Sequence, residues 1–118
     1  IYGADIDRNI LFNDEERKKT FFIDQEKPET FNKLIKEHQL TEKFDLVIDD
    51  GLHAIHANIT SLEFGLKIIK IEGWVVIEDI KNESLDFWKV IASILPAKYK
   101  SHIFSAKGGN LFAINRIN

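Results

Sequence analysis

The chain has 118 residues, of which 44% are hydrophobic and 30% are charged, and its formal net charge is −3. This length suits one globular domain with one hydrophobic core. The weak negative charge and the lack of a long basic run give no electrostatic reason to expect a nucleic acid or an anionic membrane surface as partner. A small molecule or another protein is the expected partner.

Cysteine content and hydropathy narrow the class of protein further. The sequence contains no cysteine, which excludes disulfides, thiolate nucleophiles and cysteine-based zinc or iron–sulfur sites. A metal ion would therefore need oxygen or imidazole ligands. No apolar run approaches the roughly 20 residues of a membrane span, and the N-terminus lacks the pattern of a secretion signal. We expect a soluble, cytoplasmic protein.

The first part of the chain predicts two strands and a helix. Residues 1–4 form a short apolar run that ends at Asp5, and residues 20–23, TFFI, form a second strand that stops at Asp24. The polar run 13–18 between them predicts a turn or a single helical turn. Pro28 stands at a first helical position, and apolar or aromatic side chains then recur at helical spacing: Phe31, Leu34, Ile35 and His38.

The middle of the chain predicts a strand, a long helix and another strand. Residues 44–48, FDLVI, are apolar enough to be covered on both faces, as parallel strands are. After Gly51 a helix is predicted by one apolar stripe, made by Ile55, Ile59, Leu62, Leu66 and Ile69. Gly73 then interrupts the pattern, and residues 74–77, WVVI, predict a fourth buried strand.

The last part predicts a helix and a β-hairpin. Helical spacing up to Pro96 marks the helix through Leu85, Trp88, Ile91 and Leu95. Residues 99–105 and 111–117 flank the turn sequence KGGN. Strands that alternate with helices predict a Rossmann-like, doubly wound, mostly parallel α/β sheet with helices on both faces, and the hairpin adds an antiparallel edge. Without repeats or linkers, residues 1–118 read as a single domain.

Acidic side chains end four consecutive predicted strands: Asp5, Asp24, Asp49 with Asp50, and Glu78 with Asp79. Ligands of such sheets bind beyond the carboxyl ends of the strands. Carboxylates gathered there repel each other, by about 4 kcal/mol for two charges about 4 Å apart near a protein surface, unless a cation or ligand compensates. The pattern predicts a binding site, in which Asp50, Glu78 and Asp79 are candidate ligands of Mg²⁺, Mn²⁺ or Ca²⁺.

His53 is the candidate general base of this site. It lies at the mouth of the predicted helix, where the helix N-terminus disfavours an imidazolium, and a neutral imidazole near a carboxylate can accept a proton. A simpler interpretation gives these residues no chemistry. In it, Asp49 or Asp50 caps the helix, and Glu78 pairs with Lys81.

The segments GADI, FIDQ, FDLVIDDGLH and EGWVVIEDI together resemble the class I methyltransferases that use S-adenosylmethionine. Within that superfamily, IDDG-x-H followed by IED is similar to the metal-dependent sugar O-methyltransferases of macrolide biosynthesis. The resemblance covers almost the whole chain, from the second strand of that fold to its closing hairpin. It implies an enzyme that transfers a methyl group from S-adenosylmethionine to a hydroxyl of a sugar or related small molecule.

The resemblance also implies a role for each candidate residue. Cofactor contacts would fall to the first three strand ends, with Asp5 at the ribose hydroxyls, Asp24 and Gln25 near the adenine edge, and Asp49 near the methionine end. Mg²⁺ would be held by Asp50, Glu78 and Asp79. His53 would take the proton of the acceptor hydroxyl.

The sequence departs from that superfamily in lacking its first strand and glycine-rich turn, because Gly108 and Gly109 belong to the hairpin. It also contains no methionine and opens inside a predicted strand. We therefore expect the C-terminal part of a larger, N-terminally truncated domain, inactive by itself and with an unpaired sheet edge that favours a homo-oligomer. Leu52 replaces the small polar residue expected between Gly51 and His53, which weakens the assignment of the acceptor.

Two other interpretations stay open. A methyltransferase-like fold can serve as a non-catalytic binding or scaffolding module in which the acids only cap helices. A receiver-type phosphoacceptor domain also has an acidic pair after a strand, although that fold places the pair after its first strand.

Overall fold

The structure, a computed structural model, describes residues 1–12 and 15–118. Its elements in chain order are β1 (Tyr2–Asp5), β2 (Lys19–Phe22), α1 (Pro28–His38), β3 (Phe44–Asp49), α2 (Ile55–Ile68), β4 (Ile69–Ile80), the short 3-10 helix η1 (Asn82–Ser84), α3 (Leu85–Ile94), β5 (Tyr99–Ala106) and β6 (Gly109–Arg116). This order confirms the predicted α/β class with a closing hairpin. Of the turn predicted over 13–18, residues 13–14 lie outside the described residues, and Glu15 and Lys18 form an isolated antiparallel bridge.

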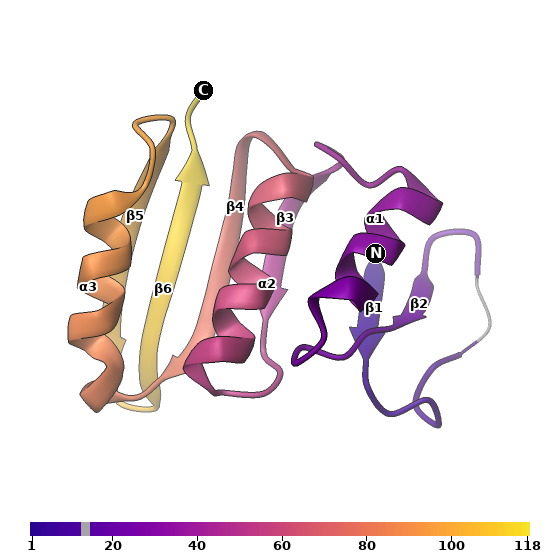
Figure 1. Cartoon of the computed structure of the whole chain (residues 1–118), viewed down its shortest axis with the longest axis horizontal. Coiled ribbons are helices and arrows are strands. Elements are labelled where there is room, and N and C mark those ends of the chain that lie inside the picture. The colour runs from indigo at the N-terminus through magenta and orange to yellow at the C-terminus, as the bar shows by residue number, and fades with distance from the viewer. Residues whose placement is uncertain (13–14) are drawn as a thin grey trace.

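The strands form two sheets (Figure 1). β1 and β2 make a parallel pair, and the second sheet has the order β3-β4-β6-β5. In that sheet β3 and β4 are parallel, whereas β6 runs antiparallel to both of its neighbours. Within the described part of the chain, no strand lies between β1 and β3. The described strands therefore form two separate sheets, with the interruption between β1 and β3.

All three helices lie over the same face of the sheets (Figure 1). The covering of both faces that the alternating pattern predicts is not observed in the described residues. On the other face, Leu46 and Ile48 of β3 are 52% and 54% exposed. The prediction that FDLVI is covered on both faces is wrong for this reason: side chains alternate along a strand, and no helix of residues 1–12 and 15–118 covers the face on which these two lie.

The main core lies between α2, α3 and the four-stranded sheet, with Leu62, Ile69, Val75, Ile77, Ile80, Trp88, Phe112 and Ile114 buried. Gly65 lets α2 approach β4 closely, because a Cβ atom there would lie 2.9 Å from the Cγ atoms of Val75. Ile69, predicted as the end of the helical stripe, is instead the first residue of β4. Among the described residues, no helix has the length and apolar character that a membrane crossing requires.

Candidate functional site

The four predicted cofactor residues line one cleft of about 840 Å³ between the two sheets. They lie at the carboxyl ends of β1, β2 and β3, and are Asp5, Asp24, Gln25 and Asp49. Asp50 also lines this cleft. The structure therefore brings these residues together as the rule of strand ends predicts. Their contacts with a cofactor stay a prediction.

Asp49 is a buried carboxylate at the end of β3, only 7% exposed. Its Oδ1 accepts hydrogen bonds from Gln25 Nε2 at 2.8 Å and from the backbone N–H of Gly51 at 3.2 Å. Its Oδ2 accepts a hydrogen bond from Asn58 Nδ2 at 2.9 Å. A buried carboxylate needs such donors, because they replace the water that it has lost.

Gln25 joins three parts of the site. Besides Asp49, its Nε2 donates to Ser61 Oγ on α2 at 2.7 Å. Its Oε1 accepts a hydrogen bond from the backbone N–H of Leu52 at 2.6 Å, in the loop that leads to His53. One amide group therefore connects the end of β2 to β3, to the loop after β3 and to α2.

Sequence reasoning missed two residues of this network, Asn58 and Ser61. Both are buried on α2, beside Ala57 and Leu62. Two polar side chains three positions apart on the buried face of an amphipathic helix are the signal that could have revealed them.

Gly51 is explained by the close approach of Gln25. A Cβ atom at position 51 would overlap Gln25 Oε1. The backbone of Gly51 is not in the left-handed region, since among the described glycines only Gly109 has a positive φ. Position 51 is therefore glycine because the Gln25 side chain leaves no room for a Cβ atom. A positive φ is not the reason.

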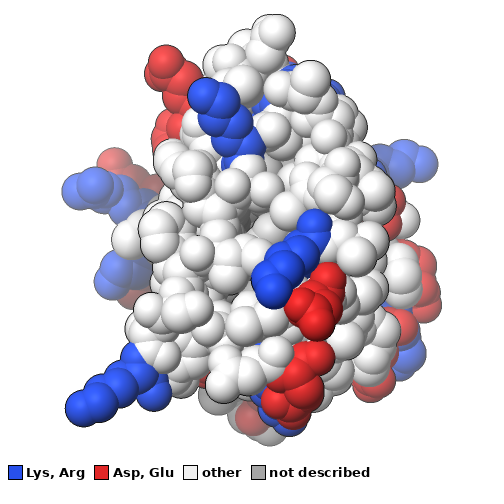
Figure 2. Space-filling model, turned by 90° about the vertical axis from the view of Figure 1, so that its left-hand side faces the viewer, with Lys and Arg blue, Asp and Glu red and all other residues white. Residues whose placement is uncertain are grey.

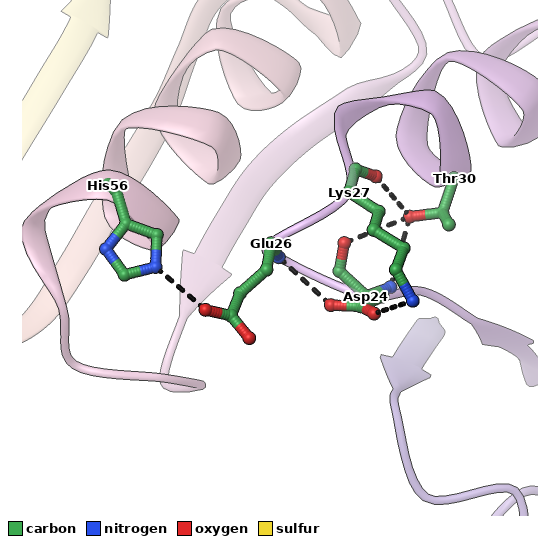
Figure 3. A network of polar contacts seen from close by, with 5 residues as sticks. All are labelled: Asp24, Glu26, Lys27, Thr30 and His56. Carbon is green, nitrogen blue, oxygen red and sulfur yellow. Dashed lines mark hydrogen bonds and ion pairs between the residues drawn. The ribbon is translucent and has the colours of Figure 1, made fainter.

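Asp24 holds the start of α1 (Figure 3). Its Oδ2 lies 3.0 Å from Lys27 Nζ, its Oδ1 accepts a hydrogen bond from the backbone N–H of Glu26 at 3.0 Å, and its own N–H donates to Thr30 Oγ1 at 3.1 Å. The hydrogen bond from Lys27, with that from Glu26, holds the pKa of Asp24 below its usual value, and Asp24 raises the pKa of Lys27. Glu26 Oε1 in turn lies 3.1 Å from His56 Nε2.

Asp50, His53 and Asp79 form a cluster in which one ligand atom of each residue lies within 4.8 Å of the others. His53 Nε2 is 3.9 Å from Asp50 Oδ1 and 3.6 Å from Asp79 Oδ2. The interpretation that Asp49 or Asp50 caps the helix is wrong, because α2 has Ala54 at its N-cap and no side-chain cap. Asp50 and Asp79 are instead exposed carboxylates that both lie within 4 Å of one imidazole nitrogen.

A bulge in β4 accompanies this position of Asp79. The pairing of β4 with β6 shifts register between Ile77 and Ile80, and Asp79 has a φ of 52°. A non-glycine residue in the left-handed region costs about 1 kcal/mol or more, and such strain concentrates at functional sites. Glu78 and Asp79, predicted to follow the strand, therefore lie within it.

Glu78 is half-buried and belongs neither to the cluster nor to the ion pairs formed among the described residues. The pairing with Lys81 suggested by the simpler interpretation is therefore not observed there. The role of Glu78 as a metal ligand stays a prediction.

The cluster suits a divalent cation. Adjacent ligands about 2.1 Å from an octahedral Mg²⁺ lie about 3 Å apart, and opposite ones about 4.2 Å, so the side chains would have to move closer together to hold an ion. They are partly or largely exposed, which leaves them room to do so. The two carboxylates are ligands that suit Mg²⁺ or Mn²⁺, whereas an imidazole suits softer metals such as zinc, iron or copper.

No protein-family model matches the chain, and no curated protein matches it either. Solved structures do match. The MycE methyltransferase of the mycinamycin biosynthetic pathway, in complex with Mg, SAH and mycinamycin VI, aligns with 98% of this chain at a TM-score of 0.70 and 24% identity. A second MycE crystal, with Mg and SAH, gives a TM-score of 0.68 and 20% identity. The chain has a class I methyltransferase fold.

An rRNA methylase from Streptococcus thermophilus shares this methyltransferase fold, with a TM-score of 0.62 and 13% identity over 99% of the chain. The chain spans 36% of the length of MycE and 73% of the length of the rRNA methylase. At these identities the comparisons establish the fold.

The contact between Gly51 and Gln25 predicts a coupled pair of substitutions. Gly51→Ala alone should destabilise this methyltransferase fold by about 1–3 kcal/mol, because the added methyl group overlaps the Gln25 amide. In a Gln25→Ala background the same change should cost much less, with a coupling energy of about 0.5–3 kcal/mol in urea unfolding. Gly108→Ala is the control, because a Cβ atom there meets nothing within 4 Å. If Gly51→Ala lowered the free energy of unfolding equally in both backgrounds, the contact between position 51 and the Gln25 amide would not explain the glycine.

The Asp24 network predicts a pH dependence. Since the pKa of Asp24 is lowered in the folded chain, its stabilisation is complete above the ordinary value of about 3.9 and is lost as the pH falls through the lower folded value. Lys27→Ala should raise the pKa of Asp24, measured by NMR titration of its carboxyl carbon. Lys33→Ala, on the exposed Lys33–Glu37 pair, should leave it unchanged. An unshifted pKa of Asp24 in the unsubstituted chain would refute this account.

Proposed function

We propose that this chain is part of an S-adenosylmethionine-dependent methyltransferase in which a divalent cation assists methyl transfer to a hydroxyl of a small molecule such as a sugar. The observation that carries the proposal is the Asp50, His53 and Asp79 cluster, together with Asp50 as a lining residue of the cleft of a methyltransferase fold. MycE, which shares the fold, was solved with Mg and SAH. We interpret the cluster at the rim of the cleft in the same way, as a site for a divalent cation beside the cofactor.

The cofactor would lie in the cleft, where it supplies a methyl group activated on a sulfonium. Asp5 Oδ1 accepts a hydrogen bond from the backbone N–H of Asp7 at 2.7 Å, which orients the carboxylate at the end of β1. Its other oxygen would accept hydrogen bonds from the ribose hydroxyls. Asp24 and Gln25 would lie near the adenine edge, and Asp49 near the methionine end.

His53 would accept the proton of the attacked hydroxyl. In this role it is a base and not a ligand of the cation, and its Nε2 lies 3.9 Å from Asp50 Oδ1 and 3.6 Å from Asp79 Oδ2, so their negative charge would favour the imidazolium that forms. Mg²⁺ held by Asp50 and Asp79, with Glu78 as the third predicted ligand, would lower the pKa of the acceptor hydroxyl. The protein's own contribution is to hold the base and the acceptor in reacting geometry.

The charge of the surface favours a small acceptor. Figure 2 shows the face that carries α3 and β5, with charges of both signs scattered between broad uncharged areas. This end of the molecule, which lies away from the cleft, presents no field of Lys and Arg for a phosphate backbone. The rRNA methylase indicates that the fold alone does not select the acceptor, so the net charge of −3 is the discriminating observation.

The alternative is a non-catalytic binding or scaffolding module with this fold. Such a module needs no cation, and the exposed carboxylates of Asp50 and Asp79 would then have no function. Cation binding therefore separates the two hypotheses.

Metal affinity is the first test. Asp50→Asn and Asp79→Asn should each weaken Mn²⁺ or Mg²⁺ binding by about 10- to 100-fold in calorimetric titration, because each removes a charged ligand. Asp79→Asn is chosen because asparagine tolerates the left-handed backbone. Asp86→Asn is the control, an exposed carboxylate paired with Lys89. Glu78→Gln decides whether Glu78 is a third ligand, and unchanged affinity in all variants would support the scaffold.

Cofactor binding is the second test. S-adenosylhomocysteine at millimolar concentration should shift the amide NMR signals of residues at the rim of the cleft, with weak affinity because the chain lacks part of the expected pocket. Asp5→Asn should remove much of this response by weakening the contact with the ribose hydroxyls. Asp45→Asn is the matched control, because Asp45 is an exposed carboxylate at the opposite end of β3, where it pairs with Lys70. Shifts centred elsewhere on the molecule, or a response equal in both variants, would count against the proposed cleft.

A further inference from the structure

A second cavity, of about 460 Å³, lies at the edge of the sheet where the C-terminus is found (Figure 1). Among the described residues, none lines both this distal cavity and the cleft. The acidic rim lies where β3 ends, whereas the distal cavity is lined by Glu42, which precedes β3, and by Arg116 at the end of β6. Sites for small molecules have volumes of about 300–1,000 Å³. The chain therefore has room for a second small ligand, away from the cofactor and the cation.

One wall of the distal cavity is fixed by Arg116, whose side chain is only 12% exposed. Its Nη2 lies 2.6 Å from Glu42 Oε1, and its Nη1 donates a hydrogen bond to the carbonyl oxygen of Ile69 at 3.0 Å. The backbone N–H of Lys43 donates to the carbonyl oxygen of Ile68 at 2.7 Å. These donors satisfy carbonyl groups at the carboxyl end of α2, so the wall is formed before any ligand binds.

The charged side chains of the distal cavity comprise two pairs of opposite charge and one additional cation. The pairs are Lys67 with Glu63, at 3.0 Å, and Arg116 with Glu42. The additional cation is Lys98, which is exposed and forms no ion pair within residues 1–12 and 15–118. Its Nζ lies 5.2 Å from the centroid of the Tyr99 ring. The cavity therefore has one positive charge in excess, placed beside an aromatic ring.

We propose that the distal cavity binds a small organic carboxylate with an aromatic or aliphatic body. The carboxylate would pair with the Lys98 ammonium, which has no carboxylate partner among the described residues. The body would lie against Ile35, Leu66 and the Tyr99 ring, which line the same cavity. A cationic ligand would be repelled by the excess positive charge, and a neutral apolar ligand would gain nothing from Lys98.

The test uses two probes of nearly equal shape, 2-naphthoate and its neutral analogue 2-naphthamide, titrated into the 118-residue chain. 2-Naphthoate at millimolar concentration should shift the amide NMR signals of Glu42, Lys67, Tyr99 and Arg116, which line the distal cavity. It should bind about fivefold more tightly than 2-naphthamide, as expected for one ion pair near the surface. Lys98→Gln should remove this difference by weakening only the binding of 2-naphthoate.

Lys100→Gln is the matched control, because Lys100 is an exposed lysine of β5 that lines neither cavity. It should leave the affinity for both probes within about twofold, as expected for an exposed site away from the ligand. Equal affinity of the two probes, a loss in Lys98→Gln that is the same for both, or shifts confined to the cleft would overturn the proposal. So would the absence of binding at millimolar concentration. Neither metal nor cofactor is present in these titrations, so their outcome is independent of the tests of the proposed function.

Discussion

The burial of the Asp49 carboxylate is the constraint around which the rim of the cleft is organised. A charge at this depth is tolerated only because Gln25, Asn58 and the Gly51 backbone donate to it. These donors come from the β2–α1 connection, from α2 and from the loop after β3. Satisfying one carboxylate therefore ties together segments that no strand pairing joins. It also explains why position 51 is glycine, since the Gln25 amide occupies the space of a side chain.

Local periodicity was enough to predict each helix and strand, because every element carries its own apolar pattern. It was not enough to predict which partners the elements meet. Ile69 fits the helical stripe and is fully buried, yet it is buried as the first residue of β4. Asn58 and Ser61 are polar residues in a helical pattern, and only the arrival of Gln25 and Asp49 from other segments gives them partners. An apolar run such as FDLVI likewise cannot tell whether a second covering layer exists in the same chain.

The acids at the strand ends separate into two groups with different physics. Asp24 and Asp49 are buried and saturated by donors from this chain, so their charges stabilise loops. Asp50 and Asp79 are exposed, and His53 is their close neighbour at distances too long for a hydrogen bond. Sequence spacing placed all four at strand ends but could not distinguish them, because burial depends on tertiary packing. The strained backbone of Asp79 could not be foreseen either, since a bulge depends on the register with β6.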